Sequence, residues 1–118
     1  MSIDRIAVIG GGTMGNGIAH VAAQHGKSVR LIDLSDDVLS SAVATISRNL
    51  DRQVKKKIID RAELDATLSR IKTVNSIEEG STGVDLVVEA VPERADLKYA
   101  IFETLDRVTD PGTILASN

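Results

Sequence analysis

An α/β fold with a doubly wound parallel sheet is the fold class that this sequence predicts. Short apolar runs alternate with stretches of helical periodicity along the whole chain. Glycines follow the first apolar run, and an acidic residue ends the second. Strands that alternate with helices pair in parallel, and right-handed crossovers then place helices on both faces of the sheet.

The first strand, helix and second strand carry the clearest pattern. A buried strand is predicted over Ile6–Ile9, and three glycines follow it. A helix is predicted from Thr13 to about His25, with Gly26 at its C-terminal end. A second strand is predicted over Ser28–Asp33.

Two helices are predicted between the second and third strands. Ser35 or Asp36 caps a long helix, and Asp60 caps a shorter one. Apolar residues at helical spacing are expected to face the core, namely Val38, Leu39, Ala42, Ile46, Leu50, Val54, Leu64 and Leu68.

The second half of the chain repeats the alternation. A third strand is predicted over Ile71–Val74, a loop or single turn over 76–83, and a central strand over Asp85–Val91. A helix from about Arg94 then buries Leu97, Ile101, Leu105 and Val108, and another strand opens at Thr113. No helix follows that strand, so residues 1–118 are expected to form one domain that is truncated before its end.

Composition narrows the classes of function. The chain has 118 residues, 42% hydrophobic and 26% charged, which suits one globular domain with an aliphatic core. A net charge of −3 argues against a nucleic-acid partner. The absence of cysteine excludes disulfides and thiolate metal sites, and no metal is expected. With no signal peptide or apolar span in the sequence, we expect a cytoplasmic protein without a membrane partner.

A glycine-rich turn predicts a dinucleotide site of the Rossmann type. The turn joins the first strand to the first helix, and Asp33 follows at about the spacing that the fingerprint requires. Gly10 allows the tight turn, Gly12 admits the pyrophosphate, and Gly15 lets the helix pack closely. The Asp33 carboxylate accepts hydrogen bonds from the ribose hydroxyls, and its charge repels a 2′-phosphate, which favours NAD over NADP. The predicted cofactor-binding residues are Gly10, Gly11, Gly12, Thr13, Met14, Gly15 and Asp33.

Two other interpretations of this segment stay open. The glycines can make a tight turn and nothing more, with Asp33 capping the next helix. An FAD-binding domain also shares the fingerprint, although its acid is more often a glutamate. Strand, turn, helix and acid together favour NAD.

Four blocks of the sequence resemble the 3-hydroxyacyl-CoA dehydrogenase family, which includes 3-hydroxybutyryl-CoA dehydrogenases. They are residues 6–19, 87–93, 97–98 and 114–118, in the family's order. The resemblance covers the first part of the family's N-terminal domain. It implies that the parent protein oxidises L-3-hydroxyacyl-CoA to 3-oxoacyl-CoA with NAD, in fatty-acid or butyrate metabolism.

The resemblance also implies further site residues. Glu93 and Lys98 fall on family positions that contact NAD, and Lys56 on a basic position that meets the CoA moiety. Asn49 stands where the family has a CoA-contacting serine. From the sequence pattern alone, Glu93 is equally compatible with a contact to a ligand at the carboxyl edge of the sheet and with a cap of the next helix. The two lysines are compatible with solvated side chains.

No catalytic residue is expected within this chain. The family's general base is a histidine paired with a glutamate, and both follow the point where the resemblance ends. His20 and His25 lie in the first helix and are assigned no catalytic role. The parent is expected to be a homo-oligomer. The alternatives are a dehydrogenase of a small hydroxy acid or sugar acid, and a non-catalytic NAD-binding module.

Overall fold

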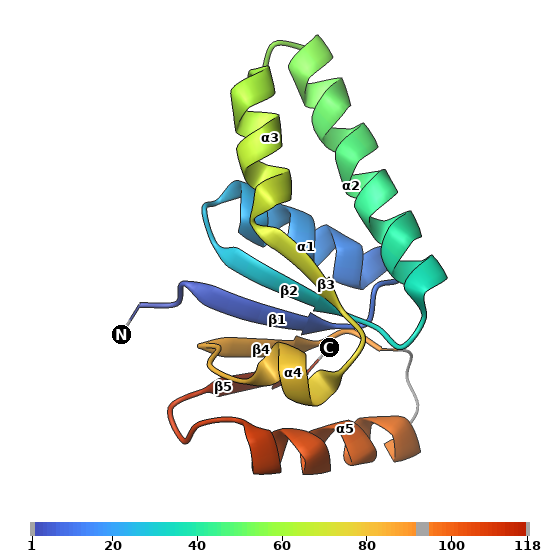
Figure 1. Ribbon diagram of the computed structural model, residues 1–118, viewed down its shortest axis with the longest axis vertical. Helices are drawn as coiled ribbons and strands as arrows, with labels where there is room; N and C mark the ends of the chain where they lie inside the picture. Colours follow the sequence, from blue (N-terminus) through green and yellow to red (C-terminus); the bar gives the residue numbers. More distant parts are fainter. Residues whose placement is uncertain (1, 92–94, 118) are drawn as a thin grey trace.

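A parallel sheet of five strands forms the centre of the computed structural model, which describes residues 2–91 and 95–117 (Figure 1). The strands are β1 (Arg5–Ile9), β2 (Ser28–Ile32), β3 (Ile71–Val74), β4 (Leu86–Glu89) and β5 (Ile114–Ser117). Their order in space is β3-β2-β1-β4-β5, and every neighbouring pair is parallel. The chain winds outward from β1 to β3 and returns to β4 on the other side of β1. The predicted Rossmann-type doubly wound fold is therefore confirmed.

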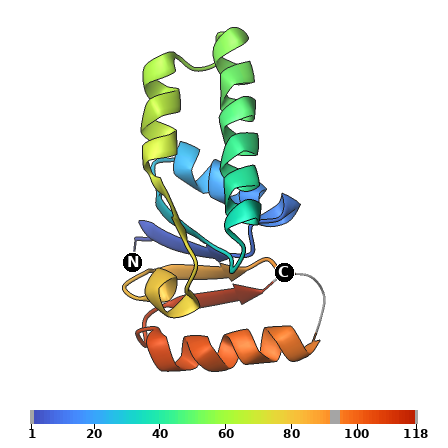
Figure 2. The same cartoon turned by 45° about the vertical axis from the view of Figure 1, so that its right-hand side comes forward.

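Helices cover both faces of the sheet. One face carries α1 (Thr13–Gln24), α2 (Asp36–Lys55) and α3 (Arg61–Ser69), and α2 and α3 extend well beyond the strands (Figure 1). The other face carries α4 (Ile77–Ser81) and α5 (Ala95–Val108), as the turned view shows (Figure 2).

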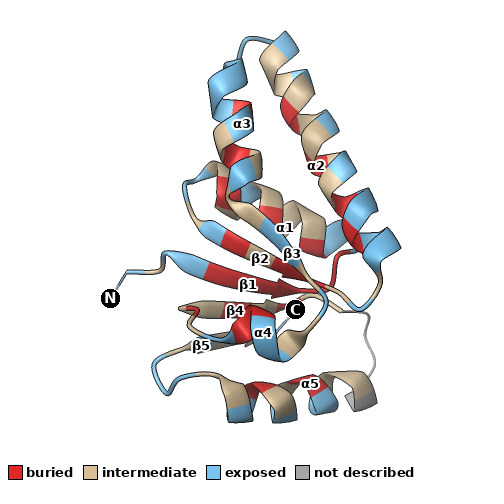
Figure 3. Ribbon diagram, in the orientation of Figure 1, coloured by how far each residue is buried: buried red, intermediate tan, exposed pale blue. Residues whose placement is uncertain are grey.

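Alternating side chains of the strands divide the core into two layers. Val8 and Leu31 point to the α1–α2 face, whereas Ala7 and Ile9 point to the α4–α5 face. The central strands are buried on both faces, which explains their continuous apolar runs (Figure 3). The helices complete the layers with Ala19, Ala23, Leu39, Ala42, Ile46, Leu50 and Leu64 on one side, and Ile101 and Leu105 on the other.

Local capping interactions fix the helix ends. The Ser35 hydroxyl accepts a hydrogen bond from Val38 N at 3.2 Å, so Ser35 is the N-cap of α2. Asp60 caps α3 by accepting from Glu63 N at 2.8 Å, as predicted. Gly26 follows α1 with a φ of +88°, a backbone conformation that favours glycine.

Two predicted elements and one predicted core residue differ in detail from the structure. The central strand is shorter than 85–91, since β4 ends at Glu89 and the chain turns away after Ala90 N bonds to Ile9 O at 2.8 Å. The segment 76–83 contains the short helix α4, capped by Ser76. Val38 is 36% exposed rather than in the core, because it borders a cavity beside the glycine turn.

Candidate functional site

Gly10, Gly12 and Gly15, the three glycines of the fingerprint, differ in what surrounds them. Gly10 has a φ of +106°, and a β-carbon there would lie 2.9 Å from Ala90 O. A β-carbon on Gly15 would overlap the carbonyl oxygen of Gly10. A β-carbon on Gly12 would meet no atom within 4 Å. Packing therefore requires the first and third glycines, while Gly12 borders open space at the N-terminus of α1.

Asp33 connects the end of β2 to the glycine turn. Its Oδ2 accepts a hydrogen bond from Gly11 N at 3.0 Å, and its Oδ1 accepts from Ser35 N at 3.0 Å. These two bonds orient a half-buried carboxylate against the glycine turn. Each oxygen retains a lone pair that can accept a hydroxyl hydrogen from a ligand.

Two cavities border this edge of the sheet. One, of about 250 Å³, is bounded by Gly10, Asp33 and an apolar wall composed of Ile9, Ile32, Leu34, Ile77, Val91, Leu97 and Ile101. The other, of about 350 Å³, lies between the glycine turn and the first turns of α2. An apolar ring fits the first cavity, and its attached sugar would then meet Asp33.

The first turn of α1 suits an anion. A helix N-terminus presents unpaired N–H groups and a partial positive charge, and α1 has no acidic residue in its first turn. Thr13 and Met14 begin this helix at the open edge, and Met14 is 47% exposed. The apolar cavity, the Asp33 carboxylate and the N-terminus of α1 all lie at this edge, an arrangement that is compatible with a dinucleotide.

A buried carboxylate lies on the other side of β1 along the same edge. Glu89, the last residue of β4, is fully buried, and its Oε1 lies 3.4 Å from Lys98 Nζ on α5. Lys98 is one of the residues that the resemblance singled out, and the structure places its side chain at this edge, 14% exposed. We did not assign Glu89 from the sequence. The available signal was an acidic residue ending an otherwise apolar strand, Leu86-Val87-Val88-Glu89.

A comparison with known protein families decides which dinucleotide-binding proteins this chain resembles. Residues 5–118 match the family described as "3-hydroxyacyl-CoA dehydrogenase, NAD binding domain". The chain belongs to this family. The match confirms the resemblance and identifies NAD as the cofactor of the family.

Curated relatives of the family support this assignment over the whole chain. A 3-hydroxybutyryl-CoA dehydrogenase of Bradyrhizobium diazoefficiens is 44% identical over 116 residues, which are 98% of this chain and 39% of that protein. A mitochondrial hydroxyacyl-coenzyme A dehydrogenase of Rattus norvegicus is 39% identical over 121 residues, which cover 98% of this chain and 38% of that protein. The chain thus spans well under half the length of these relatives.

A solved structure shows the same fold. The crystal structure of a 3-hydroxybutyryl-CoA dehydrogenase from Escherichia coli K12 superposes with a TM-score of 0.95 at 39% identity. The superposition covers 100% of this chain and 25% of that one.

The remaining family positions lie apart from the glycine turn or outside the described residues. Lys56 is exposed at the C-terminal end of α2, one helix length from Asp36 at its start, which is about 30 Å for twenty residues. Asn49 lies on the same helix and accepts from Arg52 Nη1 at 3.0 Å. Glu93 falls outside the described residues.

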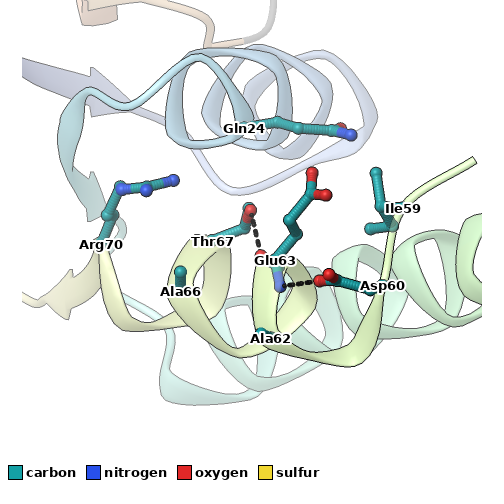
Figure 4. A pocket seen from close by; sticks show the side chains of 8 residues that line it. All are labelled: Gln24, Ile59, Asp60, Ala62, Glu63, Ala66, Thr67 and Arg70. Carbon is teal, nitrogen blue, oxygen red and sulfur yellow. Dashed lines mark hydrogen bonds between the residues drawn. The ribbon is translucent and has the colours of Figure 1, made fainter.

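A further cavity, of about 280 Å³, lies between α1 and α3, away from this edge (Figure 4). Its polar groups serve the helices: Asp60 caps α3, and the Thr67 hydroxyl donates to Glu63 O at 2.8 Å. Among residues 2–91 and 95–117, no group of three His, Cys, Asp or Glu side chains could hold a metal ion, and no helix is long and apolar enough to cross a membrane.

Proposed function

We propose that this chain is the cofactor-binding domain of an NAD-dependent dehydrogenase that oxidises L-3-hydroxyacyl-CoA to 3-oxoacyl-CoA. One observation carries the proposal: the Asp33 carboxylate, oriented by Gly11 N and Ser35 N, lines the apolar cavity and is bonded directly to the glycine turn. Family membership supports the substrate class.

Each part of the cofactor has a proposed site along the edge. The adenine ring occupies the apolar cavity, and the Asp33 carboxylate accepts hydrogen bonds from the hydroxyls of the attached ribose. The pyrophosphate lies over Gly10–Gly15, at the N-terminus of α1. Lys98 contacts the NAD further along the edge, and Glu93 is proposed as a second contact from its family position alone. When bound, NAD supplies the hydride acceptor at its nicotinamide ring.

The CoA contact is proposed for the far end of α2. Lys56 meets the phosphates of the CoA tail as a point charge, supported by its exposure and by its family position. An acyl-CoA substrate, a homo-oligomeric parent and a cytoplasmic location rest on the family and the sequence. The two histidines take no catalytic part in this proposal. His20 bonds to Gln24 at 2.8 Å within α1, and His25, the C-cap of that helix, bonds to Val21 O at 2.8 Å.

Calorimetric titration of the chain with NAD and NADP tests this proposal. A 2′-phosphate would lie against the Asp33 carboxylate, so we expect NAD to bind at least roughly tenfold more tightly than NADP. Asp33→Asn keeps an acceptor oxygen and removes the charge, and should narrow that ratio. Asp106→Asn, on the exposed surface of α5, is the matched control and should leave the ratio unchanged. Equal affinities of the unmodified chain for the two dinucleotides would refute the assignment of Asp33.

A further inference from the structure

Glu89 is the one carboxylate among the fully buried residues that the structure describes. It ends a strand that is otherwise apolar, where a hydrophobic side chain would satisfy the packing at less cost. A buried charge in such a place calls for an explanation beyond stability.

The carboxylate of Glu89 connects three segments of the carboxyl edge. Its Oε2 accepts from Val91 N at 2.7 Å, in the turn after β4. Its Oε1 accepts from the Ser117 hydroxyl at 2.7 Å, at the end of β5, and lies 3.4 Å from Lys98 Nζ on α5. Val91 and Leu97, the latter on α5, both line the apolar cavity. Glu89 therefore ties Val91, one residue of the cavity wall, to α5 and β5, and forms an ion pair with the Lys98 ammonium.

The position of Glu89 along the edge relates it to one half of a dinucleotide. Glu89 pairs with Ile9 of β1 and with Ser117 of β5, so it lies on the β4–β5 side of the glycine turn. Asp33 lies on the β2 side. A dinucleotide in a doubly wound sheet crosses the point where the strand order reverses, one nucleotide to each side. With the adenosine at Asp33, the nicotinamide nucleotide lies on the side of Glu89.

We propose that Glu89 is a positioning residue that holds Lys98 and Ser117 beneath the nicotinamide half of the cofactor and sets the charge there. The proposal rests on the proposed function, namely that this edge binds NAD. The nicotinamide ring carries one positive charge when oxidised and none when reduced. The charge of the Glu89–Lys98 pair therefore acts differently on the two forms of the cofactor, and Glu89 tunes the preference between them.

The test is the ratio of the dissociation constants of NAD⁺ and NADH. Glu89→Gln keeps the shape of the side chain and leaves one more positive charge at the edge. We expect the ratio to shift toward NADH by roughly fivefold, because the added positive charge repels the charged ring of NAD⁺ and not the neutral ring of NADH. The chain contains no tryptophan, so NADH fluorescence reports its binding without interference. NAD⁺ is measured by competition.

Lys98→Met makes the reciprocal change and keeps the proposal testable if Glu89→Gln does not fold. It leaves one more negative charge at the edge, so the ratio should shift toward NAD⁺. The double variant Glu89→Gln/Lys98→Met restores the charge balance and should restore the ratio. Glu78→Gln is the matched control for net charge, because Glu78 is 60% exposed and pairs with Arg107 at 3.7 Å, away from this edge. Its ratio should equal that of the unmodified chain.

AMP separates this inference from the proposed function. AMP lacks the nicotinamide half, so it reports only the link from Glu89 through Val91 to the apolar cavity. Any loss of AMP affinity in Glu89→Gln should be common to NAD⁺ and NADH, and by itself should leave their ratio unchanged. Equal weakening of AMP, NAD⁺ and NADH, with an unchanged ratio, would reduce Glu89 to a structural link between α5 and the sheet. A shift of the same sign in Glu89→Gln and Lys98→Met would also refute the proposal. If the unmodified chain binds neither AMP nor NAD⁺, the proposed function itself fails.

Discussion

Asp33 and Asp85 have nearly the same hydrogen bonds at opposite edges of the sheet. Each carboxylate accepts two backbone N–H groups at 2.9 to 3.0 Å. Asp33 lies at the carboxyl edge, where its oxygens also border an apolar cavity. Asp85 lies just before β4 at the amino edge, where it fastens the start of β1 and lies 3.8 Å from the guanidinium of Arg5.

The difference shows that hydrogen bonding alone does not identify a binding residue. Both aspartates stabilise a junction between segments that are distant in sequence. What distinguishes Asp33 is the apolar cavity that it lines together with Gly10, and its direct hydrogen bond to the glycine turn at Gly11. Ligands of open α/β sheets bind at the carboxyl ends of the strands, and the opposite edge serves stability.

Gly15→Ala should have the largest effect, because it destroys the close packing that shapes the carboxyl edge. The added β-carbon would overlap the carbonyl oxygen of Gly10, so the glycine turn must move. We expect a loss of roughly 3 kcal/mol or more in the free energy of unfolding, measured by urea denaturation. Gly17→Ala, in the same helix with no atom within 4 Å of the new β-carbon, is the control and should stabilise the chain slightly. A similar result for both variants would show that the turn tolerates a side chain.

Gly12→Val should abolish cofactor binding and leave the fold intact. Its backbone has a φ of −70°, which valine adopts, and its side chain would extend into open space. Because this space is proposed to hold the pyrophosphate, we expect affinity for NAD to fall roughly a hundredfold or more. Circular dichroism and the urea midpoint should stay close to those of the unmodified chain. Undiminished affinity would place the pyrophosphate elsewhere.

Lys56→Glu should have a moderate effect that is confined to the far end of α2. We expect the dissociation constant for CoA to rise roughly three- to tenfold, because an attractive point charge near phosphates becomes repulsive. A pantetheine analogue without the nucleotide phosphates should bind equally well to both forms. Lys72→Glu, on the exposed side of β3, is the control. Equal shifts for CoA and the analogue would leave Lys56 a solvated side chain.

Asp85→Asn should have the smallest effect, and a pH-dependent one. Backbone N–H donors from Asp4 and Arg5 lower the pKa of the Asp85 carboxyl below its ordinary value of 3.8. Its contribution to stability is therefore complete above pH 3.8, declines as the pH falls further, and is lost below the lowered pKa of the folded state. Urea denaturation should show the two forms differing at neutral pH and converging in acid. A constant difference across that range would mean that the charge of Asp85 contributes nothing.

Local patterns predicted most of the fold and the local geometry of the glycine turn. The glycine turn, the capping residues and the apolar periodicity each depend on residues that are close in sequence. The turn at Gly10 and the helix caps Ser35 and Asp60 could therefore be predicted. The contact of Asp33 with the glycine turn was also predictable, because the fingerprint fixes the number of residues between them.

The role of Glu89 was not predictable from such patterns. Its partners, Lys98 and Ser117, follow it by 9 and 28 residues, and only the pairing of β4 with β5 and the packing of α5 bring them together. The apolar cavity was missed for the same reason, since Ile32, Val91 and Ile101 come from three separate segments.

The account predicts that the cofactor crosses the carboxyl edge from Asp33 to Glu89, and amide chemical shifts of the ¹⁵N-labelled chain test this most directly. AMP should shift the amides of Gly12, Asp33 and Leu34, together with that of Leu97, which lines the apolar cavity, and should leave Ser117 nearly unchanged. NAD⁺ should shift all of them. Shifts that concentrate on the cavity between α1 and α3, around Gln24 and Thr67, with none at Gly12 and Asp33, would contradict it.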